Sequence, residues 1–438
     1  MKFSRFVSNF DYTIFITVII LTVIGILFIY SANVNKTPDV QTQYIKQIIF
    51  AFIGLSSLIF ILFVSQRKIQ DFTIFLYGFF LFGLIITLFF PEVKGQKRFI
   101  IQFSEFMKIV CILMLARYYS NKSKEEIKNI VTYLKSIIIV IIPVFLILLQ
   151  PDLGTLLVFF PILFFISFAA GVKKRYILYS ILLFFSISLI PVVTTLNSLF
   201  YNNENAILSL FTNTRYVMII YTTLSITLIL SALSFFNVIK GISKKAKTTF
   251  YWILFFGSVF FIGTMISYPV NKFILKQYQK DRLLIFFNPN FDPQGTGYNI
   301  IQAKTTIGNG GIFGKGWCHG DQTQRFFLPE QATDFIFPVI AEELGFFGSL
   351  LILFLYSLIF YRAFNIILIA RNYWETYTVI GILSMFLFHI IQNIGMSVGI
   401  MPITGIPLPF LSYGGSFLIA SYMSIGLIMN IQLNRYQF

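Results

Sequence analysis

Two ionisable residues stand three positions apart inside an otherwise apolar run of this chain. Glu105 and Lys108 would share one face of a helix, close enough to form an ion pair. Charged groups at membrane depth are costly, and they usually face a cavity or a bundle interior, where they mark a pathway or a site. The pair is therefore a candidate for binding a charged headgroup. A buried structural ion pair that fixes helix packing would give the same spacing.

A further carboxylate, Asp334, stands where a polar stretch ends and an apolar run begins. The positive end of the following helix dipole favours its ionised form. An ionised carboxylate at a membrane interface can act as a general base toward a sugar hydroxyl, although this position fits a helix cap equally well. Asp152, between two other apolar runs, is explained by capping of the helix that follows it.

The glycine-rich stretch 308–316 contains Gly314-Lys315 but does not match a nucleotide-binding P-loop. Asn309 stands at the first glycine position, and Gly316 replaces the serine or threonine. We expect a turn set against the membrane, with Lys315 as a candidate pyrophosphate contact.

Templates for metal binding and for serine nucleophiles do not occur in the sequence. The two histidines, His319 and His389, are far apart, and neither H-E-x-x-H nor G-x-S-x-G is present. Because His389 lies in an apolar run, we expect it to be a hydrogen-bonding residue between helices. Cys111 and Cys318 do not suggest a disulfide framework.

The segment 395–416 combines three prolines and five glycines in a mostly uncharged stretch. It cannot form one continuous helix, and non-helical backbone at membrane depth survives only when it is buried in protein or lines a cavity. We expect a broken or re-entrant segment beside an active cavity.

The composition indicates whether the elements that carry these residues lie in water or in lipid. Of 438 residues, 57% are hydrophobic and 11% are charged, and the mean hydropathy is +0.81. A soluble domain carries about 25% charged residues, so this chain must fold in lipid. This composition excludes a soluble enzyme and a disordered chain. A nucleic-acid binder is excluded as well, because the net charge of +16 is explained by membrane orientation.

The apolar runs predict an all-α, polytopic membrane bundle of about 12 spans, forming a single domain over 1–438. The predicted spans are 13–31, 47–65, 73–90, 101–118, 134–149, 153–171, 176–194, 216–236, 250–268, 335–361, 376–395 and 411–429. Basic residues favour the loops that place both termini in the cytoplasm. The stretch of about 270–334 then lies outside, and its dense turn signals predict an ordered extracytoplasmic cap.

Taken together, these segments resemble the SEDS family (shape, elongation, division and sporulation) of bacterial membrane proteins, and the run 402–409 looks like its RodA branch. Six motifs match in order over most of the chain. They are Gln102–Glu105 with Lys108, Gln150–Thr155, Asp281-Arg282 with Asn288-Pro289 and Asp292-Pro293, Gly308–Gly316, Leu328–Phe337, and Gly395–Ser416.

The resemblance implies a peptidoglycan glycosyltransferase of the bacterial inner membrane that polymerises lipid II by inverting transfer during cell elongation. Asp334 falls on the family's essential aspartate and would be the general base, while Glu105 and Lys108 fall on the polar pair of the central cavity. The remaining substrate-binding candidates are Arg98, Arg282, Lys315, Glu330 and Thr333. Undecaprenyl pyrophosphate leaves, its charge met by such cations or by a divalent metal, Mg²⁺ or Mn²⁺.

The chain departs from the family pattern in three ways. Ala332 replaces a usual histidine, Phe417 replaces a usual serine, and the family's ten spans become twelve, with a surplus pair at about 216–268. The expected partners are a class B penicillin-binding protein and other elongation-complex proteins. A lipid II flippase and a non-catalytic scaffold of that complex are the alternative functions.

Overall fold

The computed structural model describes residues 10–90, 92–93, 96–97, 102–201, 214–235, 244–289 and 296–434. The regular structure of these residues is helical, apart from a short antiparallel hairpin of β1 (Glu92–Val93) and β2 (Gln96–Lys97). The chain divides into two compact units, Met1–Val172 with Asn299–Phe438, and Lys173–Tyr298. The prediction of an all-helical protein is confirmed.

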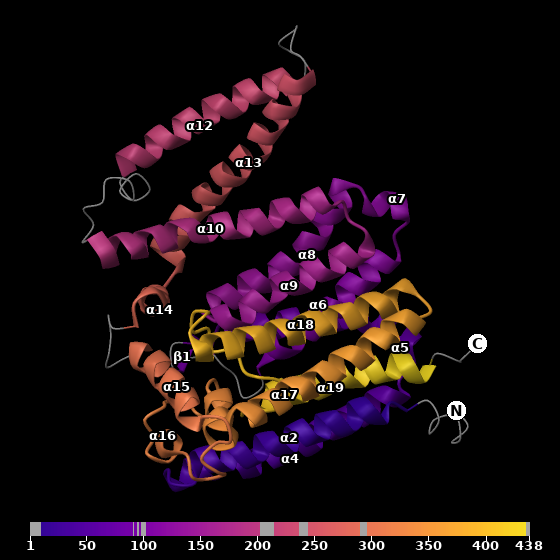
Figure 1. Ribbon diagram of the computed structural model, residues 1–438. Coiled ribbons are helices and arrows are strands. Elements are labelled where there is room, and N and C mark those ends of the chain that lie inside the picture. Colours follow the sequence, from indigo (N-terminus) through magenta and orange to yellow (C-terminus); the bar gives the residue numbers. More distant parts are fainter. Residues whose placement is uncertain are drawn as a thin grey trace. The chain divides into compact units, whose positions relative to one another are not determined.

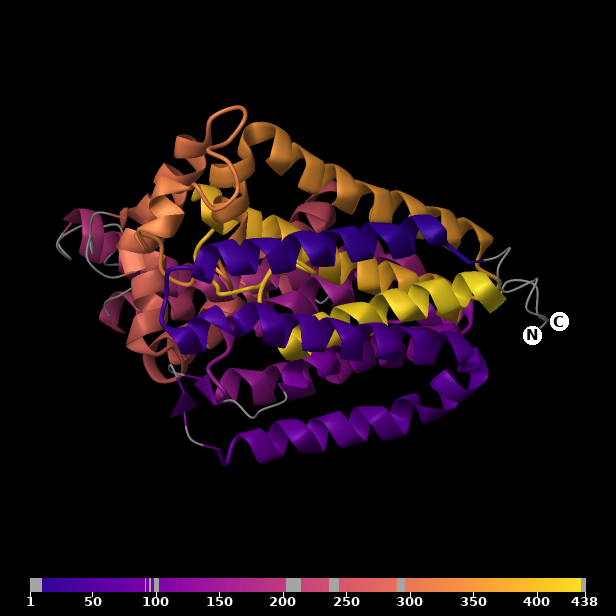
Figure 2. The same ribbon diagram turned by 90° about the horizontal axis from the view of Figure 1, so that it is seen from below.

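The first unit is a bundle of long helices that run side by side (Figures 1 and 2). In it α19 packs along α4, α18 packs against both α6 and α9, and α17 packs against α2. Its helices are α2 (Tyr12–Asn33), α3 (Pro38–Gln41), α4 (Gln43–Phe63), α5 (Gln66–Thr87), α6 (Phe103–Ser120), α7 (Lys124–Ile127), α8 (Ile130–Leu149), α9 (Leu153–Ala170), nearly all of α15 (Thr296–Gly310), α16 (Asp321–Gln324), α17 (Ile336–Ile369), α18 (Tyr373–Val398) and α19 (Gly415–Leu433).

The second unit contains the helices of the predicted surplus pair. They are α12 (Thr214–Phe235) and α13 (Lys244–Pro269), and α13 packs against both α12 and α10 (Lys174–Tyr201). A short π-helical turn, η1 (Val270–Ile274), and α14 (Gln277–Phe287) follow. Within the stretch 270–334, the described residues form η1, α14, α15 and α16.

Ten helices of the described chain are long and apolar enough to cross a membrane, namely α2, α4, α5, α8, α9, α10, α13, α17, α18 and α19. The two other predicted spans correspond to α6, which carries Glu105, Lys108 and Arg117, and to α12, whose apolar part is Tyr221–Leu233. The molecule is a polytopic membrane protein.

Local sequence signals explain where several of these helices begin and end. Asp11 caps α2 by accepting from the N–H of Ile14 (3.0 Å). Asp152 caps α9 in the same way, as its position in the sequence predicted. Gly345 interrupts α17 with a φ of +69°, so residues 336–344 form a separate helical piece from residues 346–369.

The predicted break near the C-terminus is confirmed. Helix α18 ends at Val398, Gly399 follows in the left-handed conformation, and residues 400–414 contain no helix. We call residues 400–414 the broken segment. The predicted start of the last span at residue 411 is wrong, because Leu408 and Ser412 form a tight turn in which Ser412 Oγ accepts from the Leu408 N–H (2.8 Å).

Candidate functional site

Asp334 lies in the turn that precedes α17, and two neighbouring elements hold this turn in place. Nδ2 of Asn393, on α18, donates to the carbonyl oxygen of Asp334 (2.8 Å), and the N–H of Tyr413 donates to that of Ala332 (2.8 Å). The half-buried carboxylate faces the broken segment, since a Cβ built on Gly405 would lie 3.3 Å from Asp334 Oδ2. The predicted base is thus positioned by α18 and the broken segment together.

The other residues predicted in this motif form the same turn. Thr333 Oγ1 donates to Glu330 Oε2 (3.2 Å), and the N–H groups of Thr333 and Phe335 both donate to the Glu330 carbonyl oxygen. Glu330 is exposed and has a φ of +50°, a conformation that costs a side chain about 1–2 kcal/mol. Phe335, rather than Asp334, occupies the N-cap position of α17.

A cation that the sequence did not single out lies beside this turn. Lys36, in the loop after α2, places its ammonium 5.6 Å from the ring centroid of Phe326. Burial lowers the pKa of Lys36, and the nearby Glu330 carboxylate offsets part of that effect. Because Lys36 is far from the motif in the sequence, spacing could not have revealed it.

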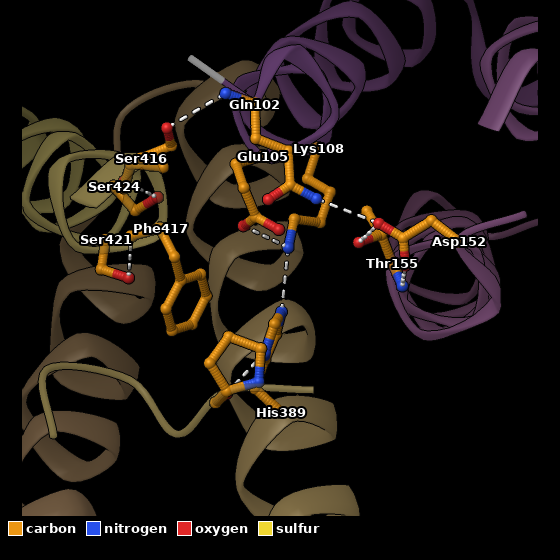
Figure 3. Close-up of polar contacts among 12 residues, drawn as sticks. Gln102, Glu105, Lys108, Asp152, Thr155, His389, Ser416, Phe417, Ser421 and Ser424 are labelled. Carbon is orange, nitrogen blue, oxygen red and sulfur yellow. Dashed lines mark hydrogen bonds and ion pairs between the residues drawn. The ribbon is translucent and has the colours of Figure 1, made fainter. Parts of the chain in front are cut away.

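Glu105 and Lys108 form the predicted ion pair on α6, with 2.7 Å between Glu105 Oε2 and Lys108 Nζ. Both side chains are almost fully buried. Lys108 Nζ also lies 3.1 Å from His389 Nε2 on α18 and 5.3 Å from the ring centroid of Phe417 on α19 (Figure 3). The expectation that His389 bonds between helices is confirmed, and its partner is one of the predicted site residues.

The tautomer of His389 follows from its partners. Its Nδ1 lies 3.0 Å from the carbonyl oxygen of Pro407, which can only accept, so Nδ1 carries the proton. Nε2 then accepts from the ammonium of Lys108. The imidazole also stacks on Phe417, with 4.7 Å between ring centroids. Phe417, one of the departures from the family pattern, therefore covers the ion pair from the side of α19.

A second polar group lies at the start of α6 (Figure 3). Gln102 Nε2 donates to Asp152 Oδ2 (3.0 Å), while its backbone N–H donates to Ser416 Oγ (3.1 Å). Asp152 also accepts from Thr155 Oγ1 (2.8 Å). Asp152 is thus both the predicted helix cap and a link between the starts of α6 and α9, while Gln102 links the start of α6 to that of α19.

Two adjacent buried carboxylates anchor the glycine-rich stretch to the first piece of α17. Glu342 accepts from Asn309 Nδ2 (2.8 Å) and from the backbone of Gln322 and Thr323, and Glu343 accepts from the N–H of Cys318 (3.1 Å). The stretch is not a turn throughout, because α15 continues to Gly310. The stretch 311–316 then forms backbone hydrogen bonds with the stretch 342–347.

Of the other predicted substrate-binding residues, the structure describes Lys315 and Arg282. Lys315 is exposed, and its N–H donates to the Glu342 carbonyl oxygen (2.9 Å). Arg282 belongs to α14 of the second unit, where its guanidinium lies 5.7 Å from the ring centroid of Tyr278. Arg98 and the motif residues Asp292-Pro293 lie outside the described residues.

A divalent cation would need a cluster of donor side chains. Within the described ranges there is no group of three or more His, Cys, Asp or Glu side chains that could hold a metal ion. The described residues offer a positioned carboxylate and a buried, hydrogen-bonded ammonium.

Comparison with known proteins adds sequence and fold evidence to this geometry. A family model described as cell cycle protein, covering FtsW, RodA and SpoVE, matches residues 11–215 and 206–437. The chain is 37% identical to the peptidoglycan glycosyltransferase RodA of Treponema pallidum over 98% of each chain.

Two solved structures share the fold. One is described as the structural coordination of polymerization and crosslinking by a peptidoglycan synthase complex, with a TM-score of 0.66 at 24% identity, covering 98% of this chain and 99% of that one. The other is the rod shape determining protein RodA of Thermus thermophilus, with a TM-score of 0.59 at 21% identity, covering 98% of each chain.

Proposed function

The chain belongs to the FtsW/RodA/SpoVE (SEDS) family of peptidoglycan glycosyltransferases, and on this premise we propose that it polymerises lipid II during cell elongation with Asp334 as the general base. The observation that carries the proposal is the position of Asp334. Asn393 of α18 holds its backbone carbonyl, and its half-buried carboxylate faces the broken segment, inside a motif that resembles the one around the family's essential aspartate.

In the proposed reaction, the Asp334 carboxylate takes the proton of the 4-hydroxyl of one lipid-linked disaccharide. The hydroxyl oxygen bonds to the anomeric carbon of the growing chain's terminal sugar, whose bond to the pyrophosphate oxygen breaks with inversion. Undecaprenyl pyrophosphate departs with the bonding electron pair. A base held in place before the substrate arrives contributes through proton transfer and orientation.

Cations would stabilise the charge of the departing pyrophosphate. Lys108 is one candidate, because an ammonium has three N–H donors and the described contacts with Glu105 and His389 account for two of them. Arg98, Arg282, Lys315 and Lys36 are further candidates, and Glu330 with Thr333 would contact the sugar beside Asp334.

The same proposal includes an arrangement in the membrane. With α6 and α12 counted as spans, the chain has twelve, both termini are cytoplasmic, and Asp334 and the stretch of about 270–334 lie on the extracytoplasmic side. Loops rich in Lys and Arg support this orientation. A class B penicillin-binding protein is the proposed partner, which the description of one structural relative supports.

The test is polymerisation of labelled lipid II by purified protein with its partner present. Wild-type protein should make glycan strands, and Asp334→Asn, which keeps the size of the side chain, should lower the rate at least about 10²-fold, as for other acid–base groups. Strand synthesis by Asp334→Asn at the wild-type rate would refute the base assignment. Transfer of lipid II across vesicle bilayers without strand growth would favour the flippase.

A further inference from the structure

Three neighbouring polar side chains of α18 bind the backbone of the broken segment. Gln392 Nε2 donates to the Pro402 carbonyl oxygen (2.9 Å), Asn393 Nδ2 to that of Ile406 (2.8 Å), and His389 Nδ1 to that of Pro407 (3.0 Å). Carbonyl groups of non-helical backbone must find donors when the segment is buried in a membrane protein. All three bonds meet this need.

Asn393 and His389 each make a second contact, and these contacts reach the two halves of the candidate site. The same Nδ2 of Asn393 donates its other hydrogen to the Asp334 carbonyl oxygen (2.8 Å). His389 Nε2 accepts from Lys108 (3.1 Å; Figure 3). The two residues are four positions apart, so they stand one above the other on a single face of α18.

We infer that Asn393 and His389 are positioning residues, which together fix the carboxylate of Asp334 relative to the ammonium of Lys108. Asn393 holds the backbone of Asp334 against Ile406 of the broken segment. His389 holds Lys108 against Pro407, the next residue of that segment. This inference rests on the proposed role of Asp334 as the base. It assigns two residues that motif matching did not select.

The burial of these side chains makes the arrangement rigid. Asn393 is 0% exposed and His389 is 1% exposed, and both hydrogens of Asn393 Nδ2 are used in the bonds described above. A reacting group misplaced by about 1 Å can lose about 10²-fold in rate. Removing either residue should therefore lower kcat while the substrate still binds.

The test compares Asn393→Leu with Gln392→Leu in the lipid II polymerisation assay. Each variant loses an amide that binds the broken segment, but Gln392→Leu leaves the bonds to Asp334 and Lys108 intact. We expect kcat per folded molecule to fall about 10²-fold for Asn393→Leu and less than about threefold for Gln392→Leu, with KM nearly unchanged in both. Thermal unfolding in detergent gives the folded fraction.

Two further variants keep the test decisive if Asn393→Leu folds poorly. Asn393→Gln retains both N–H donors but moves them by one methylene, so kcat should still fall. His389→Gln can donate to Pro407 and accept from Lys108, so it should stay within about threefold of wild type, whereas His389→Leu should lose at least about tenfold.

Equal activity of His389→Gln and His389→Leu would overturn the inference, as would equal losses for Asn393→Leu and Gln392→Leu. These results are distinct from a failure of the proposed function itself. In that case Asp334→Asn would polymerise normally, whatever the α18 variants do.

Discussion

Replacing Gly405 with alanine tests the position of the proposed base most directly. The new Cβ would lie 3.3 Å from Asp334 Oδ2 and 4.0 Å from its Cγ, closer than most such contacts, so the carboxylate must move by a few tenths of an ångström. Gly405 also has a φ of +73°, where a side chain costs about 1–2 kcal/mol. The substitution therefore adds backbone strain and displaces the carboxylate.

The two effects can be separated by a matched control. Gly171, at the end of α9, has a φ of +93°, and a Cβ there would meet nothing within 4 Å. Gly171→Ala should thus share the loss of about 1–2 kcal/mol in stability without any effect on the rate per folded molecule. For Gly405→Ala we expect a similar loss of stability and a fall in kcat of about tenfold, equivalent to about 1.4 kcal/mol of activation free energy.

The assay is the initial rate of strand synthesis at saturating lipid II, normalised to the folded fraction. The reasoning is refuted if Gly405→Ala polymerises at the same normalised rate as Gly171→Ala. In that case the approach of the broken segment to Asp334 has no part in positioning the carboxylate.

Three further predictions concern buried charges. Lys108→Met should destabilise the fold by about 3–5 kcal/mol because it leaves Glu105 buried without its cation. Adding Glu105→Gln should recover part of the stability in thermal unfolding but not the polymerase activity. Recovery of both stability and activity would favour a purely structural pair. Glu342→Gln should cost about 1.5–3 kcal/mol and speed limited proteolysis within residues 311–324, whereas an unchanged cleavage rate would contradict the anchoring role. Asp11→Asn keeps the cap of α2 but removes the ion pair with Arg362, in which Asp11 Oδ2 lies 2.8 Å from Arg362 Nη2. We expect the stability to fall by about 1 kcal/mol. If that loss does not depend on salt concentration, its origin is not ionic.

Much of the architecture follows from hydropathy alone. Each of the twelve apolar runs overlaps a helix, and the prolines and glycines of 395–416 predict the break between α18 and α19. The helix ends are less predictable, because they depend on tertiary bonds. The start of α19 is four residues later than expected, since a turn closed by Leu408 and Ser412 occupies those positions.

The candidate site is likewise predictable from the sequence only in part. The spacing of Glu105 and Lys108 predicts their pairing, because both lie on one helix. The contacts of His389 with Lys108 and of Lys36 with Phe326 join residues more than 250 positions apart, and Asn393 lies 59 positions from Asp334, so no local pattern contains them. The one local signal was the pair of polar residues four apart in α18, which periodicity places on a single face.

The break at Gly345 has a consequence for how the protein enters the membrane. Glu342 and Glu343 precede it, and carboxylates are disfavoured at the centre of a helix during insertion, by about 2.5–3.5 kcal/mol each on scales measured with the cellular translocon. Residues 346–369 contain no carboxylate and one charged residue, Arg362 near their end, and they span roughly 36 Å at 1.5 Å per residue, enough to cross the bilayer alone. The nascent chain can therefore insert α17 from Phe346 onward. The two glutamates and the piece that leads to Asp334 would dock afterwards, when residues 309–324 have folded and supply their donors. We therefore expect the site to assemble after insertion, as a late step of biogenesis.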